Sequence, residues 1–172
     1  ASDDQMASKN LVEFAVEKGL YNPETDGEFN FSKAYTRDDD RDRTYNDPRV
    51  WVMQKRLNPS LEQNPDTGRS FPVFLTPERK GTIEDAKALM RDHFAGTEHD
   101  PYGHGLRGDE PWRPISVFRT YEAHVMQVRP WLPKEIGQVI YVALGMADLS
   151  VFIPFYAGLT RVPASWSKWT DQ

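Results

Sequence analysis

Apolar and polar side chains alternate along residues 113–130, a pattern that predicts extended chain. The apolar set is Val117, Phe118, Val125, Met126 and Val128, and the polar set is Arg119, Thr120, Glu122, His124 and Gln127. Successive side chains of a strand point to opposite faces, so the alternation predicts an apolar face and a polar face. A buried polar group without a partner costs free energy, and we therefore expect this strand or hairpin to line a polar surface.

Turn signals about every ten residues divide the second half of the chain, from Ile115 onward, into short strands. The predicted strands are Ile115–Thr120, Ala123–Arg129, Val139–Leu144 and Val151–Tyr156. Such spacing is typical of a meandering antiparallel sheet.

The first half carries helical patterns instead. Ser8 can cap a first helix that Gly19 ends, and Asp47-Pro48 begins a second helix that stops at Asn58-Pro59. Phe29 and Phe31 alternate with polar residues, which favours a short extended piece.

A third helix is expected to begin near Thr82. The sequence Thr82-Ile-Glu-Asp85 resembles a capping box with Asp in the place of Glu or Gln. Ile83, Ala86, Met90 and His93 then recur at helical spacing.

The order of these elements predicts an α+β fold. Residues 1–96 are helix-rich, residues 97–114 form a loop and residues 115–160 are strand-rich. We expect residues 1–172 to form a single domain or a fragment of a larger catalytic domain, since 172 residues can enclose a core.

Composition excludes several classes of function. The net charge of −5 disfavours nucleic acid as a partner, because phosphate binding needs a concentrated basic surface. No apolar run approaches the roughly 20 residues that span a bilayer, so we expect no membrane partner and a cytoplasmic location. The chain has 0 cysteines, which excludes disulfides and zinc–thiolate sites.

Two groups of residues raise the question of a metal. The mixed charge run Asp38–Arg43 has carboxylates that suit calcium, but a solvated turn is favoured because the helix–loop calcium pattern and its glycine are missing. His93, His99 and His104 follow no zinc-ligand spacing. We therefore expect no metal ion at these residues.

Four segments, in order along the chain, carry a family resemblance. They are Met6–Phe14, Tyr45–Trp51, Asp100–Gly103 and Arg113–Pro130. Together they resemble the later half of the cysteine dipeptidases among the N-terminal-nucleophile hydrolases. The resemblance implies part of a four-layer αββα sandwich. It also implies hydrolysis of dipeptides by an amino-terminal cysteine, with no metal or organic cofactor. Because this chain has no cysteine, the nucleophile is expected to lie outside it, and the chain alone is expected to be inactive.

The expected partners are a dipeptide substrate in the intact parent enzyme and the rest of that polypeptide or a homo-oligomer. Arg119 is a supporting catalytic candidate, because an arginine can hold a substrate carboxylate, and a structural ion pair with Glu122 is the alternative. The candidates for substrate binding are Asp100, Tyr102, His104, Glu122 and His124. A non-catalytic interaction or structural domain remains the alternative function.

Overall fold

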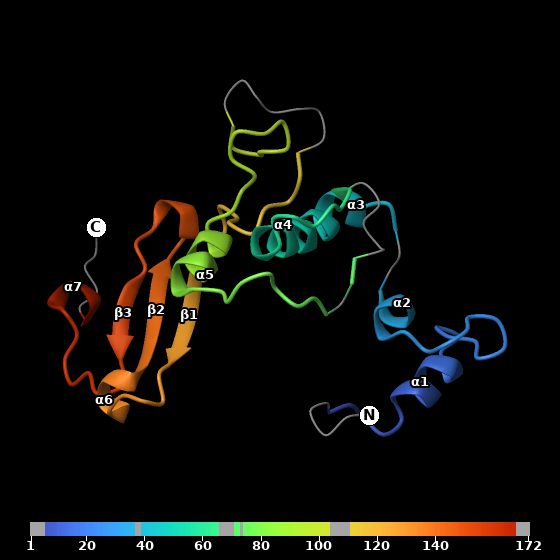
Figure 1. The fold of residues 1–172 in the computed structure, drawn as a ribbon, viewed down its shortest axis with the longest axis horizontal. Coiled ribbons are helices and arrows are strands. Elements are labelled where there is room, and N and C mark those ends of the chain that lie inside the picture. The colour runs from blue at the N-terminus through green and yellow to red at the C-terminus, as the bar shows by residue number, and fades with distance from the viewer. Residues whose placement is uncertain (1–5, 37–38, 66–70, 73, 104–110, 168–172) are drawn as a thin grey trace. The chain divides into compact units, whose positions relative to one another are not determined.

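The computed structural model describes residues 6–36, 39–65, 71–72, 74–103 and 111–167. The chain divides into two compact units, residues 1–40 and residues 41–172. Figure 1 shows helices through the first half of the chain and a sheet near its end. The α+β prediction is therefore confirmed, with a three-stranded antiparallel sheet after the helices.

The first unit holds two short helices. Helix α1 spans Leu11–Glu17 and buries Ala15, and Gly19 follows it at a φ of +67°, in the left-handed conformation predicted for a helix end. Helix α2 spans Phe31–Tyr35. The extended piece predicted around Phe31 is therefore wrong, because the Asn30 side chain accepts a hydrogen bond from the backbone NH of Lys33 and caps a helix there.

The second unit begins with α3 (Asp42–Tyr45) and α4 (Asp47–Leu57). Pro48 lies in the first turn of α4, where it has no intrahelical hydrogen bond to lose, and the helix ends before Asn58 as predicted.

Helix α5 spans Ile83–Met90 and begins with the predicted capping box. The Thr82 hydroxyl accepts from the backbone NH of Asp85 at 3.1 Å, and the Thr82 NH donates to the Asp85 carboxylate at 2.8 Å. The helix ends three residues before His93, so the prediction that His93 continues its face is wrong.

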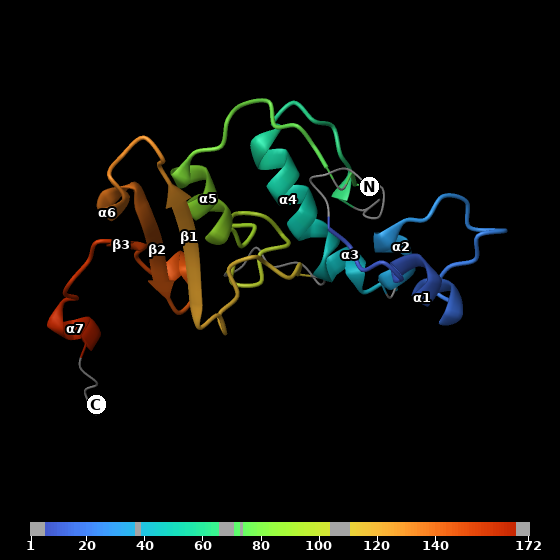
Figure 2. The same ribbon diagram turned by 90° about the horizontal axis from the view of Figure 1, so that it is seen from below.

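The sheet consists of β1 (Glu122–Val128), β2 (Gln138–Leu144) and β3 (Ile153–Tyr156), in the order β1-β2-β3. Figure 2 shows α5 beside β1, and a short helix α6 (Lys134–Gly137) connects β1 to β2. A 3-10 helix η2 (Ala147–Leu149) connects β2 to β3, and α7 (Ala164–Ser167) follows the sheet. Three of the four predicted strands are thus confirmed.

The strand predicted at Ile115–Thr120 is absent: this segment runs as bends and turns. Its backbone is bonded to other segments, with the Ser116 NH donating to the Asp92 carbonyl at 2.9 Å and the Phe118 NH donating to the Tyr102 hydroxyl at 2.9 Å. Because these backbone NH groups donate to distant residues, they are not paired with a neighbouring strand.

The core lies on one face of the sheet. Ala143, Ala147 and Phe152 are buried there, with Ala123, Val125 and Tyr141 packed against them. Lys87 of α5 lies over the Tyr141 ring, 4.1 Å from its centroid, so α5 covers this face. Among the helices that the structure describes, none is both long enough and apolar enough to cross a membrane.

Candidate functional site

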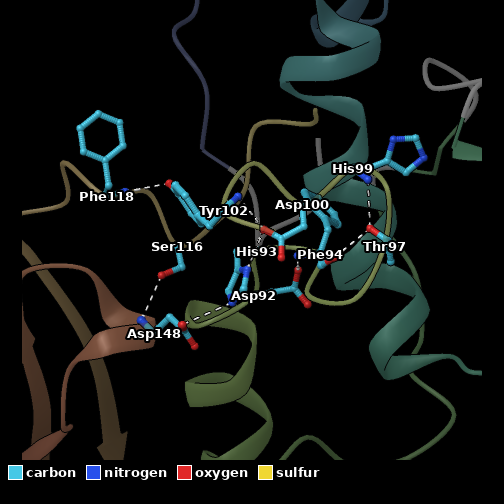
Figure 3. A network of polar contacts seen from close by, with 10 residues as sticks. All are labelled: Asp92, His93, Phe94, Thr97, His99, Asp100, Tyr102, Ser116, Phe118 and Asp148. Atoms are coloured by element: carbon cyan, nitrogen blue, oxygen red, sulfur yellow. Dashed lines mark hydrogen bonds and ion pairs between the residues drawn. The ribbon is translucent and has the colours of Figure 1, made fainter. Parts of the chain in front are cut away.

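A polar network lies at the junction of the turn after α5, the loop that follows it and the η2 turn (Figure 3). At its centre, His93 Nδ1 lies 3.1 Å from Asp100 Oδ1, and His93 Nε2 lies 3.3 Å from Asp148 Oδ2. Each ring nitrogen of His93 therefore faces a carboxylate oxygen, one from the loop after α5 and one from η2.

The two carboxylates differ in burial. Asp100 is only 4% exposed, whereas the Asp148 side chain is 33% exposed. Asp100 also accepts a hydrogen bond from the backbone NH of Tyr102 at 2.9 Å, and this bond closes the turn around it. The buried contact with Asp100 therefore has the larger energetic weight, because solvent screens an exposed pair.

The backbone at Phe94 directs His93 into this network. Phe94 has a φ of +61°, which is unusual for a bulky residue, and it is 6% exposed. Its NH donates to the Asp92 carboxylate at 3.1 Å, and its ring meets that of Trp112 edge-on at 5.2 Å. These contacts hold a tight turn between α5 and the loop, which ends the helix before His93.

Trp112 anchors the other end of the loop. Its ring stacks on that of His99 with centroids 3.6 Å apart, and the backbone NH of Trp112 donates to the His99 carbonyl at 3.0 Å. Trp51 of α4 meets the same indole edge-on at 5.9 Å. His99 is therefore held in an aromatic cluster.

A cavity of about 390 Å³ adjoins the network. Trp51 and Ala88 lie on its helical walls, and the segment from Asp92 to Thr97 lines it together with Asp148. In the described part of the chain, no group of three or more His, Cys, Asp and Glu side chains is arranged to hold a metal ion.

The structure brings two of the predicted site residues into this network. Asp100 and Tyr102 lie in it, and the Tyr102 hydroxyl binds the backbone of Phe118, the residue before Arg119. The Arg119 side chain is exposed and lies near its neighbour Phe118, with 5.8 Å between guanidinium and ring centroid. His104 lies outside the described residues.

Glu122 and His124 form a separate pair on β1. Their side chains are 40% and 45% exposed, and His124 Nδ1 lies 2.8 Å from Glu122 Oε1. The predicted separation of polar and apolar faces is wrong here. Met126 and Val128 share the exposed face with this pair, whereas Gln127 lies on the opposite face with Val125.

Sequence reasoning missed His93 and Asp148 as parts of one network. Asp148 is 55 positions from His93 in the chain, and only the fold of β2 and η2 brings the carboxylate to the ring. Local helical spacing assigned His93 to a helix face instead. The turn at Phe94, with its positive φ, ends α5 before His93, and no sequence motif predicts this turn.

Comparison with known proteins gives one family throughout. The profile described as Peptidase family C69 matches residues 1–172. A protein named probable dipeptidase from Salmonella dublin is 52% identical over 154 residues, which are 90% of this chain and 35% of that protein. A dipeptidase from Bifidobacterium longum is 36% identical over 171 residues, which are 92% of this chain and 32% of that protein. The chain thus spans about a third of the length of these relatives.

Proposed function

The chain belongs to peptidase family C69, and we propose that it forms the later part of an enzyme that hydrolyses dipeptides. Relatives named dipeptidase and about three times as long support this proposal. The nucleophile is an amino-terminal cysteine outside these residues, and its own α-amino group serves as base. The residues present here then orient the substrate and build the walls of the site.

The observation that carries the proposal is a sheet of which the described residues leave one face largely uncovered. Opposite α5, the sheet presents apolar side chains from all three strands: Met126, Val128, Ile140, Val142, Leu144, Ile153 and Phe155. Met126, Val128 and Leu144 are 70%, 67% and 56% exposed. We call this set the open sheet face. An apolar face of this kind is stable in water only when another layer covers it.

The occupant that fits this face is a second sheet from the rest of the same polypeptide. Such a layer completes the αββα sandwich that the sequence predicted, and it makes residues 1–172 part of one larger catalytic domain. The ring of Trp166 in α7 lies 5.0 Å from Phe155 and covers only one corner of the open sheet face. A homo-oligomer that pairs two such faces is the competing occupant.

Substrate orientation is assigned to two groups of residues. Arg119 contributes positive charge that attracts the substrate carboxylate, and the Asp100–Tyr102 loop supports the backbone beside it. Glu122 and His124 project from the open sheet face at the beginning of β1, where they border the second layer and contact substrate at its edge. His104 belongs to the same proposal by its position in the loop.

A hydrolysis assay on the intact enzyme tests the function. We expect cleavage of an alanyl dipeptide, its loss after alkylation of the cysteines and no turnover by residues 1–172 alone, because loss of a nucleophile removes several orders of magnitude in rate. Turnover by this chain alone, or full activity after alkylation, would overturn the mechanism.

The second arm compares two substitutions. Arg119→Ala should reduce activity more than His124→Ala, since orientation of the substrate needs the guanidinium whereas the base is already supplied. A fully active Arg119→Ala enzyme contradicts the role given to Arg119. An enzyme that folds and binds a partner without any hydrolysis would favour the non-catalytic interaction domain.

A further inference from the structure

Three arginines surround one tyrosine ring in the second unit. The guanidinium carbons of Arg113, Arg41 and Arg49 lie 4.1, 5.0 and 5.8 Å from the centroid of Tyr45. We call this set the arginine cluster. A guanidinium attracts an aromatic face, but each further cation beside the same ring adds repulsion among the cations.

Arg113 is the central member of the arginine cluster. Its backbone NH donates to the Thr44 carbonyl at 2.8 Å, which fixes the residue against α3. Its Nε is buried and has no hydrogen-bond partner among the described residues. A buried donor without an acceptor is costly, and a water molecule, an ion or a ligand can supply the missing acceptor.

The charges around Arg113 are of the same sign. Burial lowers the pKa of the Arg113 guanidinium, and the positive charges of Arg119 and Arg41 lower it further. Among the described residues, no carboxylate forms an ion pair within 4.0 Å of Arg113, Arg41 or Arg119. An anion bound between these side chains would supply the missing acceptor and relieve the repulsion.

Arg49 has a different role in the arginine cluster. Its Nε donates to the Tyr45 carbonyl at 2.9 Å, and another of its nitrogens contacts the Asn46 side chain. Burial lowers the pKa of Arg49, and the nearby carboxylate of Asp42 acts in the opposite direction. Arg49 therefore fixes the tyrosine, whereas Arg113 and Arg41 are available to a ligand.

We propose that the arginine cluster is a carboxylate-binding site centred on Arg113, and that it holds the free α-carboxylate of a dipeptide. The choice of this anion rests on the proposed function, because a dipeptide always presents a carboxylate one residue beyond its scissile bond. A guanidinium fork matches the two oxygens of a carboxylate with two parallel hydrogen bonds. Recognition of the chain end at the half-buried Arg113 would exclude longer peptides.

The test measures binding separately from hydrolysis. The probes are alanylalanine with an N-methylated peptide bond, which resists cleavage, and the carboxamide of the same compound. Titration calorimetry on the intact enzyme should show tighter binding of the free acid. A charged hydrogen bond contributes about 1.5–3 kcal/mol, which corresponds to a preference of roughly tenfold to a hundredfold.

Two substitutions at Arg113 separate recognition from structure. Arg113→Met keeps an unbranched apolar stem beside Tyr45, and we expect it to abolish the preference for the free acid while leaving the affinity for the carboxamide unchanged. Arg113→Lys should recover part of the preference, because the charge remains and the fork is lost.

Arg129→Met is the matched control. Arg129 also has a buried Nε without a partner among the described residues and lies 5.8 Å from a tyrosine ring, that of Tyr156, but it already donates to the Ile136 carbonyl at 2.5 Å. The preference for the free acid should survive in this variant.

Equal affinity of the wild-type enzyme for acid and carboxamide would overturn the carboxylate site. So would an Arg113→Met variant that loses affinity for both probes alike, since that result assigns a structural role to Arg113. Absence of alanylalanine hydrolysis together with a retained preference for the free acid would refute the proposed function and leave the carboxylate site standing.

Discussion

Removal of the Asp100 carboxylate should destabilise the protein strongly. Asp100 is 4% exposed and is the acceptor for the Tyr102 NH at 2.9 Å and the partner of His93 Nδ1 at 3.1 Å. Asp100→Ala leaves both of these groups without their acceptor at a position where the carboxylate itself is buried. Each unsatisfied group costs about 1–3 kcal/mol, so the expected loss of unfolding free energy is about 2–5 kcal/mol.

Asp100→Asn separates the contribution of hydrogen bonding to the unfolding free energy from the contribution of the charge. The amide oxygen can still accept from Tyr102, whereas the attraction to His93 is lost, and we expect a loss of about 1–2 kcal/mol. Asp148→Asn is the control on the other side of the imidazole. Its side chain is 33% exposed and the pair is longer, so the loss should stay below about 1 kcal/mol.

Urea unfolding of the intact enzyme at pH 7 measures these differences. Fluorescence of Trp112 is a suitable signal, because this indole is 7% exposed and stacks on His99 at the end of the same loop. Linear extrapolation gives the unfolding free energy of each variant. If Asp100→Ala is as stable as wild type, or if Asp148→Asn is the most damaging change, the burial argument for this network is refuted.

Three further predictions concern the helix cap, the core and the open sheet face. Hydrogen bonds from Arg79 and Thr82 hold the pKa of Asp85 below its ordinary value of 3.8, so its stabilisation is present above that pH and is lost as pH falls through the lowered pKa. The stability difference between wild type and Asp85→Asn should therefore shrink in urea titrations from pH 5 to pH 3, and a constant difference contradicts it. Phe152→Ala should cost about 3–5 kcal/mol in thermal or urea unfolding, because Phe152 is 7% exposed in the core; a loss below about 1 kcal/mol would show that the site collapses or is not packed. Met126→Lys should destabilise the intact enzyme by more than about 1 kcal/mol if a second layer covers the open sheet face, and unchanged stability there would contradict the sandwich.

Local chemistry in the sequence was enough to locate several elements. Asp47-Pro48 and Asn58-Pro59 bounded α4, and Thr82 with Asp85 began α5, because caps and prolines act within a few residues of one another. Turn signals about every ten residues also located β1, β2 and β3. The ordered motifs identified the peptidase family, and Asp100 and Tyr102 were correctly placed together in one loop.

Only the tertiary structure decided the rest. The segment from Ile115 to Thr120 alternates like a strand, yet its backbone hydrogen bonds go to Asp92 and Tyr102, so no ladder forms. His93 has helical spacing but lies beyond the end of α5, where Asp100 contacts one of its ring nitrogens and Asp148 contacts the other. In each case the deciding partner lies far away in the chain or in a turn without a motif. Periodicity records which side chains share a face, whereas the choice among distant hydrogen-bond and ion-pair partners depends on how the whole chain packs.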